Sequence, residues 1–137
     1  MLPAHILIVD SDPTVALVTQ RGLERILASE ATVEVAPSPT DAWTRCLRGS
    51  VDLLIVDPNP ETSPAATLVK WLHASRPDIP VLVLTAYDTP RLRAQMRSLG
   101  VRHYLAKPVE LQDLGQLVRT AVASSQVLPN QAIGDRR

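Results

Sequence analysis

Five short apolar segments, each followed by a stretch with apolar residues at helical spacing, constrain the fold of this chain most strongly. The segments are rich in Val, Ile and Leu, and continuous apolar runs of this length are typical of strands buried on both faces of a parallel sheet. The sequence predicts strands over residues 5–9, 32–36, 51–56, 80–85 and 101–106. The strands and helices therefore alternate along the whole chain.

Capping residues and prolines mark where the intervening helices begin. Ser38 and Thr89 each precede a proline, and this pair of residues is typical of an N-cap followed by the first helical position. The predicted helices cover residues 13–29, 39–48, 65–75, 90–99 and 111–122. Strands that alternate with helices pair in parallel through right-handed crossovers. We therefore predict an α/β fold, a parallel sheet with helices on both faces.

The length of 137 residues suits one compact domain, and 45% apolar residues are ample for its core. We assign residues 1–123 to that domain. Residues 124–137 are polar and include Pro129 and Gly134, so we expect a frayed tail or linker there.

The charges balance, with 14 basic and 14 acidic residues, so no overall field favours nucleic acid or an anionic membrane. A single cysteine, Cys46, allows no internal disulfide. The chain shows neither an apolar run long enough to span a bilayer nor a signal peptide at its start. These features predict a cytoplasmic protein without membrane or direct nucleic-acid binding.

Polar residues follow four of the predicted strands. Open α/β sheets bind ligands at the carboxyl ends of their strands, so we expect these residues to converge there. They are Asp10, Ser11 and Asp12 after the first strand, Asp57 after the third, Thr85 in the fourth and Lys107 after the fifth.

This set of residues has a definite chemical logic. Clustered carboxylates repel one another, and a hard cation with oxygen ligands, Mg²⁺, relieves the repulsion. Asp57 is the best candidate for a nucleophile that forms an acyl phosphate, because it ends a wholly apolar strand. Lys107 would supply a positive charge and Thr85 a hydrogen bond to the phosphoryl group.

Four segments, Ile6–Asp10, Val51–Asp57, Val81–Ala86 and Gly100–Pro108, resemble the receiver family of response regulators in sequence and order. The resemblance covers about residues 5 to 122. It implies a (βα)5 doubly wound, flavodoxin- and CheY-like sheet with strand order 2-1-3-4-5. The implied function is a signalling domain that catalyses only its own phosphorylation and dephosphorylation.

The same resemblance implies roles for individual residues. Asp57 would take a phosphoryl group from a sensor histidine kinase, and Asp10, Asp57 and the backbone carbonyl of Asn59 would hold Mg²⁺. The backbone N–H groups of Asn59 and Ala86 would bind phosphoryl oxygens. Thr85 and Tyr104 would then move, changing the surface of the fourth helix, fifth strand and fifth helix that partners read. Tyr104 has a simpler alternative as a half-buried strand aromatic.

The sequence departs from the family at the metal site. Ser11 stands where the family has a second acidic residue, so Mg²⁺ binding should be weak unless Asp12 reaches the metal. Asp12 is equally suited to cap the first helix. These departures leave open a degenerate pseudo-receiver that binds partner proteins without phosphorylation.

Two further departures concern the loop after Asp57 and the start of the fifth strand. Pro58 removes one backbone N–H but leaves that of Asn59. Arg102 and His103 stand where dimerising members carry acidic residues, so we expect at most a weak homodimer.

A flavin-binding protein or a haloacid-dehalogenase-type phosphatase would use a similar sheet. The first needs a Ser/Thr-rich phosphate loop and the second an Asp at position 59, and this chain has neither. The arginines of the fourth helix, Arg91, Arg93 and Arg97, are interpreted as a solvated surface. The output domain or downstream partner is unidentified.

Overall fold

The computed structural model describes residues 2–59 and 62–135, with the side chains of 124–135 left aside. Its centre is a five-stranded parallel sheet with the order β2-β1-β3-β4-β5, as the resemblance to the receiver family implies. The strands are β1 (Ala4–Val9), β2 (Ala31–Val35), β3 (Leu53–Val56), β4 (Val81–Thr85) and β5 (His103–Ala106).

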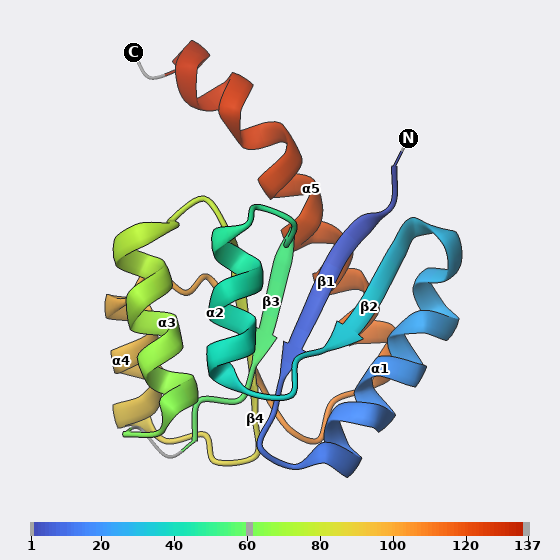
Figure 1. Cartoon of the computed structure of the whole chain (residues 1–137), viewed down its shortest axis with the longest axis vertical. Coiled ribbons are helices and arrows are strands. Elements are labelled where there is room, and N and C mark those ends of the chain that lie inside the picture. The colour runs from blue at the N-terminus through green and yellow to red at the C-terminus, as the bar shows by residue number, and fades with distance from the viewer. Residues whose placement is uncertain (1, 60–61, 136–137) are drawn as a thin grey trace.

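Helices cover both faces of the sheet, and Figure 1 shows α2 and α3 on the near side and α5 on the far side. The helices are α1 (Pro13–Leu27), α2 (Pro39–Leu47), α3 (Pro64–Ser75), α4 (Pro90–Ser98) and α5 (Leu111–Asp135), with a 3-10 turn, η1 (Ala28–Glu30), before β2. In the part of the chain described, none of these helices is long and apolar enough to cross a lipid bilayer.

Alternation along β1 divides the core into two layers. Ile6 and Ile8 pack with α1 and α5, whereas Leu7 and Val9 pack with α2, α3 and α4. Every residue of β3 is buried, because this strand lies in the middle of the sheet with helices on both sides. The sheet is thereby fixed as a rigid platform for the residues at its edge.

Side-chain hydroxyls cap three helices at their amino ends. Ser38 and Thr89 accept hydrogen bonds from backbone N–H groups of α2 and α4 at 3.1 and 3.0 Å, which confirms both predicted caps. Ser63 caps α3 in the same way, with its oxygen 3.1 Å from the Ala66 nitrogen. These contacts satisfy N–H groups that the helices themselves leave without partners.

The observed β3, β4 and β5 begin one or two residues later than predicted, whereas β1 and β2 begin one residue earlier. Helix α5 continues to Asp135, past residue 124, where the sequence analysis places the start of a tail or linker. Figure 1 shows this part of α5 extending past the sheet. Helix propagation is easier than nucleation, and the packed turns up to Ala121 provide the nucleus. Whether these residues form a linker stays a prediction.

Helices α1 and α5 approach closely where each carries a glycine. A methyl group on Gly115 would lie 2.8 Å from Cγ2 of Ile26, and one on Gly22 would lie 2.6 Å from Cδ1 of Leu111. Real carbon–carbon contacts are longer than either distance. The two glycines therefore set the spacing between the helices.

We expect Gly115→Ala to destabilise the protein by about 1–2 kcal/mol, although Ala in a helix interior is normally about 1 kcal/mol better than Gly. The branched Ile26 side chain has little rotamer freedom with which to move away. In an Ile26→Ala background the same substitution should become neutral or stabilising. Urea unfolding followed by fluorescence of Trp43 and Trp71 measures both, and equal effects in the two backgrounds would contradict the steric explanation.

Candidate phosphorylation site

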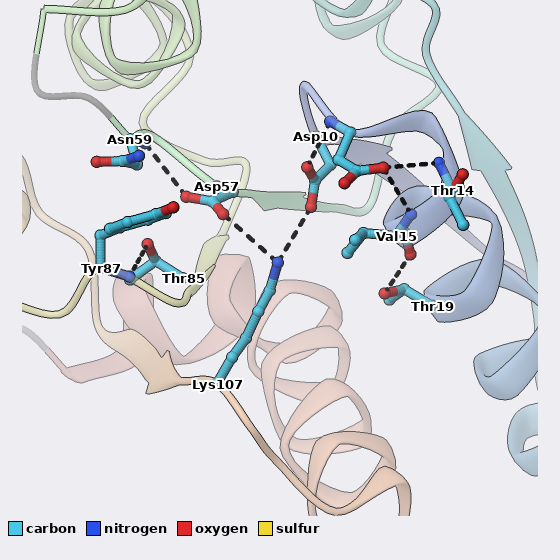
Figure 2. Close-up of polar contacts among 10 residues, drawn as sticks. Asp10, Thr14, Val15, Thr19, Asp57, Asn59, Thr85, Tyr87 and Lys107 are labelled. Carbon is cyan, nitrogen blue, oxygen red and sulfur yellow. Dashed lines mark hydrogen bonds and ion pairs between the residues drawn. The ribbon is translucent and has the colours of Figure 1, made fainter.

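Two carboxylates and one ammonium group meet at the carboxyl edge of the sheet (Figure 2). The Nζ atom of Lys107 lies 3.2 Å from Oδ2 of Asp10 and 3.4 Å from Oδ2 of Asp57. The side chains of Asp10, Asp57 and Lys107 are only 10%, 14% and 22% exposed. Because the cluster is largely shielded from water, its charges interact more strongly than surface ion pairs do.

Backbone pairing places these side chains. The ladder between β1 and β3 ends with Val9 opposite Val56, and the N–H of Asp57 then donates to the carbonyl of Val9 at 3.1 Å. On the other side, the N–H of Lys107 donates to the carbonyl of Thr85 at 2.8 Å. Residues separated by up to 97 positions in the sequence therefore meet at one point.

The loop after Asp57 turns back toward its carboxylate. The N–H of Asn59 donates to Oδ1 of Asp57 at 3.2 Å, so one carboxylate oxygen faces this N–H and the other faces Lys107. Pro58 is buried, and its carbonyl accepts a hydrogen bond from the Ser63 hydroxyl at 3.0 Å. Ser63 thus fixes the loop and caps α3 at once, a role that the sequence analysis missed.

Thr85 is the one buried polar residue of the described core, with none of its surface exposed. Its oxygen accepts a hydrogen bond from the N–H of Tyr87 at 3.1 Å, which leaves the hydroxyl hydrogen available to a further acceptor. The neighbouring Ala86 is exposed. In Figure 2 the Tyr87 side chain extends from this loop toward Asp57 and Asn59.

The residues after β1 take distinct positions. The N–H of Asp12 donates to Oδ1 of Asp10 at 2.9 Å, whereas its own Oδ1 accepts from the N–H groups of Thr14 and Val15 at 3.0 and 3.2 Å. Asp12 is therefore the N-cap of α1, one of the two roles that the sequence allowed. A metal-binding role for Asp12 stays a prediction, and Ser11 is exposed.

Tyr104 lies on β5 in a polar network that the sequence did not reveal. Its hydroxyl donates to Oδ1 of Asp88 at 2.9 Å, and Arg93 pairs with Oδ2 of Asp88 at 2.7 Å. Burial, and then the hydrogen bond to Asp88, raise the pKa of Tyr104 to about 12. Arg93 and Tyr104 in turn lower the pKa of Asp88. No regular spacing links these residues, because they come from a loop, a helix and a strand.

The donor set at the site suits a small, hard cation. Among the described residues, no three His, Cys, Asp or Glu side chains are grouped as a metal site, and the carboxylates of Asp10 and Asp57 are the pair at this edge. Mg²⁺ commonly binds through one or two carboxylates and keeps several waters, so two carboxylates and a backbone carbonyl are enough. The residues therefore fit Mg²⁺, although only two of the available ligands carry a negative charge.

Residues 6–119 match the family described as the response regulator receiver domain. The chain belongs to this family. It is therefore the receiver domain of a two-component response regulator, and phosphorylation and Mg²⁺ binding are typical of such domains. This assignment replaces the flavin-binding and phosphatase alternatives that the sheet alone allowed.

Curated relatives of this receiver domain are longer regulators. It is 27% identical over 135 residues to the DNA-binding transcriptional regulator NtrC of Rhizobium meliloti. This alignment covers 98% of this chain and 27% of that protein. It is 31% identical over 123 residues to the transcriptional regulatory protein GlrR of Escherichia coli K12, which covers 90% of this chain and 27% of that one. The receiver domain thus spans about a quarter of each relative.

Solved structures share the fold over almost the whole receiver domain. A response regulator from Thermotoga maritima matches with a TM-score of 0.77 and 27% identity, covering 90% of this chain and all of the other, 100%. The signal receiver domain of an HD domain-containing protein from Pseudomonas fluorescens Pf-5 matches with a TM-score of 0.82 and 24% identity, over 95% and 94% of the two chains. The second likeness shows the fold alone.

The cap at Asp12 predicts a clear difference between two substitutions. Asp12→Ala should cost about 1 kcal/mol of stability because it removes the acceptor for two N–H groups of α1, whereas Asp12→Ser should keep most of it. Urea unfolding monitored by circular dichroism measures both variants. Equal losses for Ala and Ser would contradict the capping role.

Proposed function

We propose that Asp57 is the phosphoacceptor of this receiver domain and takes its phosphoryl group from a sensor histidine kinase. The observation that carries this proposal is the position of Lys107, whose ammonium group lies between the carboxylates of Asp57 and Asp10 at a shielded edge of the sheet. Two carboxylates held beside one cation provide a nucleophile, a second acid for a metal and a positive charge for the incoming group.

The proposed reaction transfers one phosphoryl group. A carboxylate oxygen of Asp57 forms a bond to phosphorus while the phosphorus–nitrogen bond to the donor histidine breaks, and the electron pair of that bond stays with the imidazole. Lys107 offsets the added negative charge. The Thr85 hydroxyl and the N–H groups of Asn59 and Ala86 donate hydrogen bonds to the phosphoryl oxygens.

The metal site follows from the same cluster. Asp10, Asp57 and the backbone carbonyl of Asn59 would hold Mg²⁺, with Asp12 as a tentative additional ligand. When bound, Mg²⁺ supplies positive charge that offsets the negative charge of the phosphoryl group. Because Ser11 adds no charge, we propose that binding is weak.

The proposed output is a change in the surface formed by α4, β5 and α5. The charge of Asp57 acts on the Tyr104 hydroxyl, and this hydroxyl donates a hydrogen bond to Asp88 in the loop before α4, so a change at Asp57 can reach this surface. We propose that the domain works in the cytoplasm, and that an output domain or downstream protein reads the surface. We propose that the domain itself binds neither nucleic acid nor membranes.

The role of Asp57 as the phosphoacceptor can be tested by the mass of the protein. Incubation with acetyl phosphate and Mg²⁺ should add the mass of one phosphoryl group to the wild-type domain, and Asp57→Asn should abolish the gain. Asp52→Asn is a matched control, because this aspartate lies just before the opposite end of β3 and accepts a hydrogen bond from the His5 N–H at 2.8 Å. Intact-protein mass spectrometry in neutral buffer gives the readout.

The outcomes separate the two functions that the sequence left open. A gain that needs both Mg²⁺ and Asp57 supports phosphorylation-dependent signalling. A folded domain that gains no mass and shows no beryllofluoride-induced NMR shifts at millimolar Mg²⁺ would instead favour the pseudo-receiver, which binds partners without modification. An unchanged gain in Asp57→Asn would refute this residue as the acceptor.

Ser11 should limit the affinity of the site for Mg²⁺. Ser11→Asp should raise the affinity for Mg²⁺ about tenfold or more, because affinity rises with the number of charged oxygen ligands. Ser29→Asp adds the same charge at the other end of α1, in η1, and should leave the affinity nearly unchanged. NMR shifts of the Asn59 and Ala86 amides during a Mg²⁺ titration report binding. Equal affinities for wild type and Ser11→Asp would show that the metal binds elsewhere.

A further inference from the structure

The network around Asp88 joins three elements beside the candidate phosphorylation site. Asp88 lies in the loop between β4 and α4, Arg93 lies on α4, and Tyr104 lies on β5. The two oxygens of Asp88 are used separately, one for the Tyr104 hydroxyl at 2.9 Å and one for Arg93 at 2.7 Å. The guanidinium carbon of Arg93 also lies 4.5 Å from the centre of the Tyr104 ring.

Each pair of residues in this network therefore makes a contact. Asp88 holds the hydroxyl end of Tyr104, Arg93 covers its ring, and the Asp88–Arg93 ion pair connects the two. Removal of either charged residue weakens two contacts at Tyr104 together. This arrangement fixes which way the ring points more effectively than a single hydrogen bond would.

The Asp88–Arg93 ion pair is exposed enough for salt to weaken it. The side chains of Arg93 and Asp88 are 47% and 30% exposed, and exposed ion pairs are weak and are screened by salt. By contrast, the ring of Tyr104 also packs against the buried layer that contains Leu92 and Met96. Packing keeps the ring near this face, while the charges select its orientation.

The loop also connects the network to the candidate site. Thr85 accepts a hydrogen bond from the N–H of Tyr87, the residue immediately before Asp88. A displacement of the loop at Thr85 therefore changes the position of Asp88. A displacement of Asp88 likewise moves the backbone that is bonded to Thr85. The negative charge of Asp57 already acts on the Tyr104 hydroxyl.

We propose that Asp88 and Arg93 form an electrostatic latch that sets the resting orientation of Tyr104 in the unmodified receiver domain. The latch is a property of these two side chains and not of the phosphorylation site. Its role in signalling rests on the proposed function, since it regulates the surface that phosphorylation of Asp57 would change. The orientation of Tyr104 on the surface of α4, β5 and α5 should consequently change with ionic strength before any phosphoryl group is added.

The test uses the full chain labelled with 3-fluorotyrosine. The sequence contains two tyrosines, so the ¹⁹F spectrum shows two signals, and Tyr87→Phe assigns that of Tyr104. In wild type at low salt we expect one dominant Tyr104 orientation. Raising the salt to about 1 M, where the screening length is about 3 Å, should lower the ratio of this orientation to the alternative several-fold.

Two variants break the latch with opposite changes of net charge. Asp88→Asn and Arg93→Gln should both shift the Tyr104 signal in the direction that salt shifts it, by a similar factor of about five, and should remove most of the salt dependence. Arg97→Gln is the matched control, because it neutralises another exposed arginine of α4. This control should behave like wild type. Unfolding midpoints of all variants confirm that each one is folded.

Several results would overturn the latch. Shifts of opposite sign in the Asp88 and Arg93 variants would show a simple effect of charge, and an unchanged signal in both would show that packing alone orients the ring. A shift in Arg97→Gln equal to that in Arg93→Gln would remove the specific role of Arg93. All readouts use unmodified protein, so failure of Asp57 to accept phosphate leaves this result interpretable.

Discussion

The pairing of β1 with β3 is the constraint on which the site depends. Their ladder ends with Val9 opposite Val56, so the next residue on each strand, Asp10 and Asp57, projects from neighbouring strand ends. Two shielded carboxylates at neighbouring strand ends repel each other, and a nearby cation relieves this repulsion. Lys107 fills this role from the residue just after β5, two strands from β3 in the sheet.

Much of this arrangement could be predicted from the sequence, because it depends on local patterns and on topology. Apolar runs identified the strands, and prolines at the first helical position identified the starts of α1, α2 and α4. Parallel pairing then required the polar residues after the strands to meet at one edge. The positions of Asp10, Asp57 and Lys107 agree with this reasoning because no detail of side-chain packing enters it.

Other features depend on tertiary contacts that leave no pattern in the sequence. Asp12 suited a cap and a metal ligand equally, and only the positions of two N–H groups in the folded chain show that it caps α1. The network of Asp88, Arg93 and Tyr104 joins residues without a common period. The helical backbone after residue 123 shows the same limit, since polar composition alone does not show where a helix that began in a packed segment will end.

Burial separates the two charge clusters of this receiver domain by how they can respond. The carboxylates of Asp10 and Asp57 are shielded, so charges there interact strongly and salt screens them little. The Asp88–Arg93 pair is more exposed, and its small interaction energy can be overcome by modest forces. A switch needs both kinds of contact. A strong local change at Asp57 is useful only if the surface beyond it is held by interactions weak enough to rearrange.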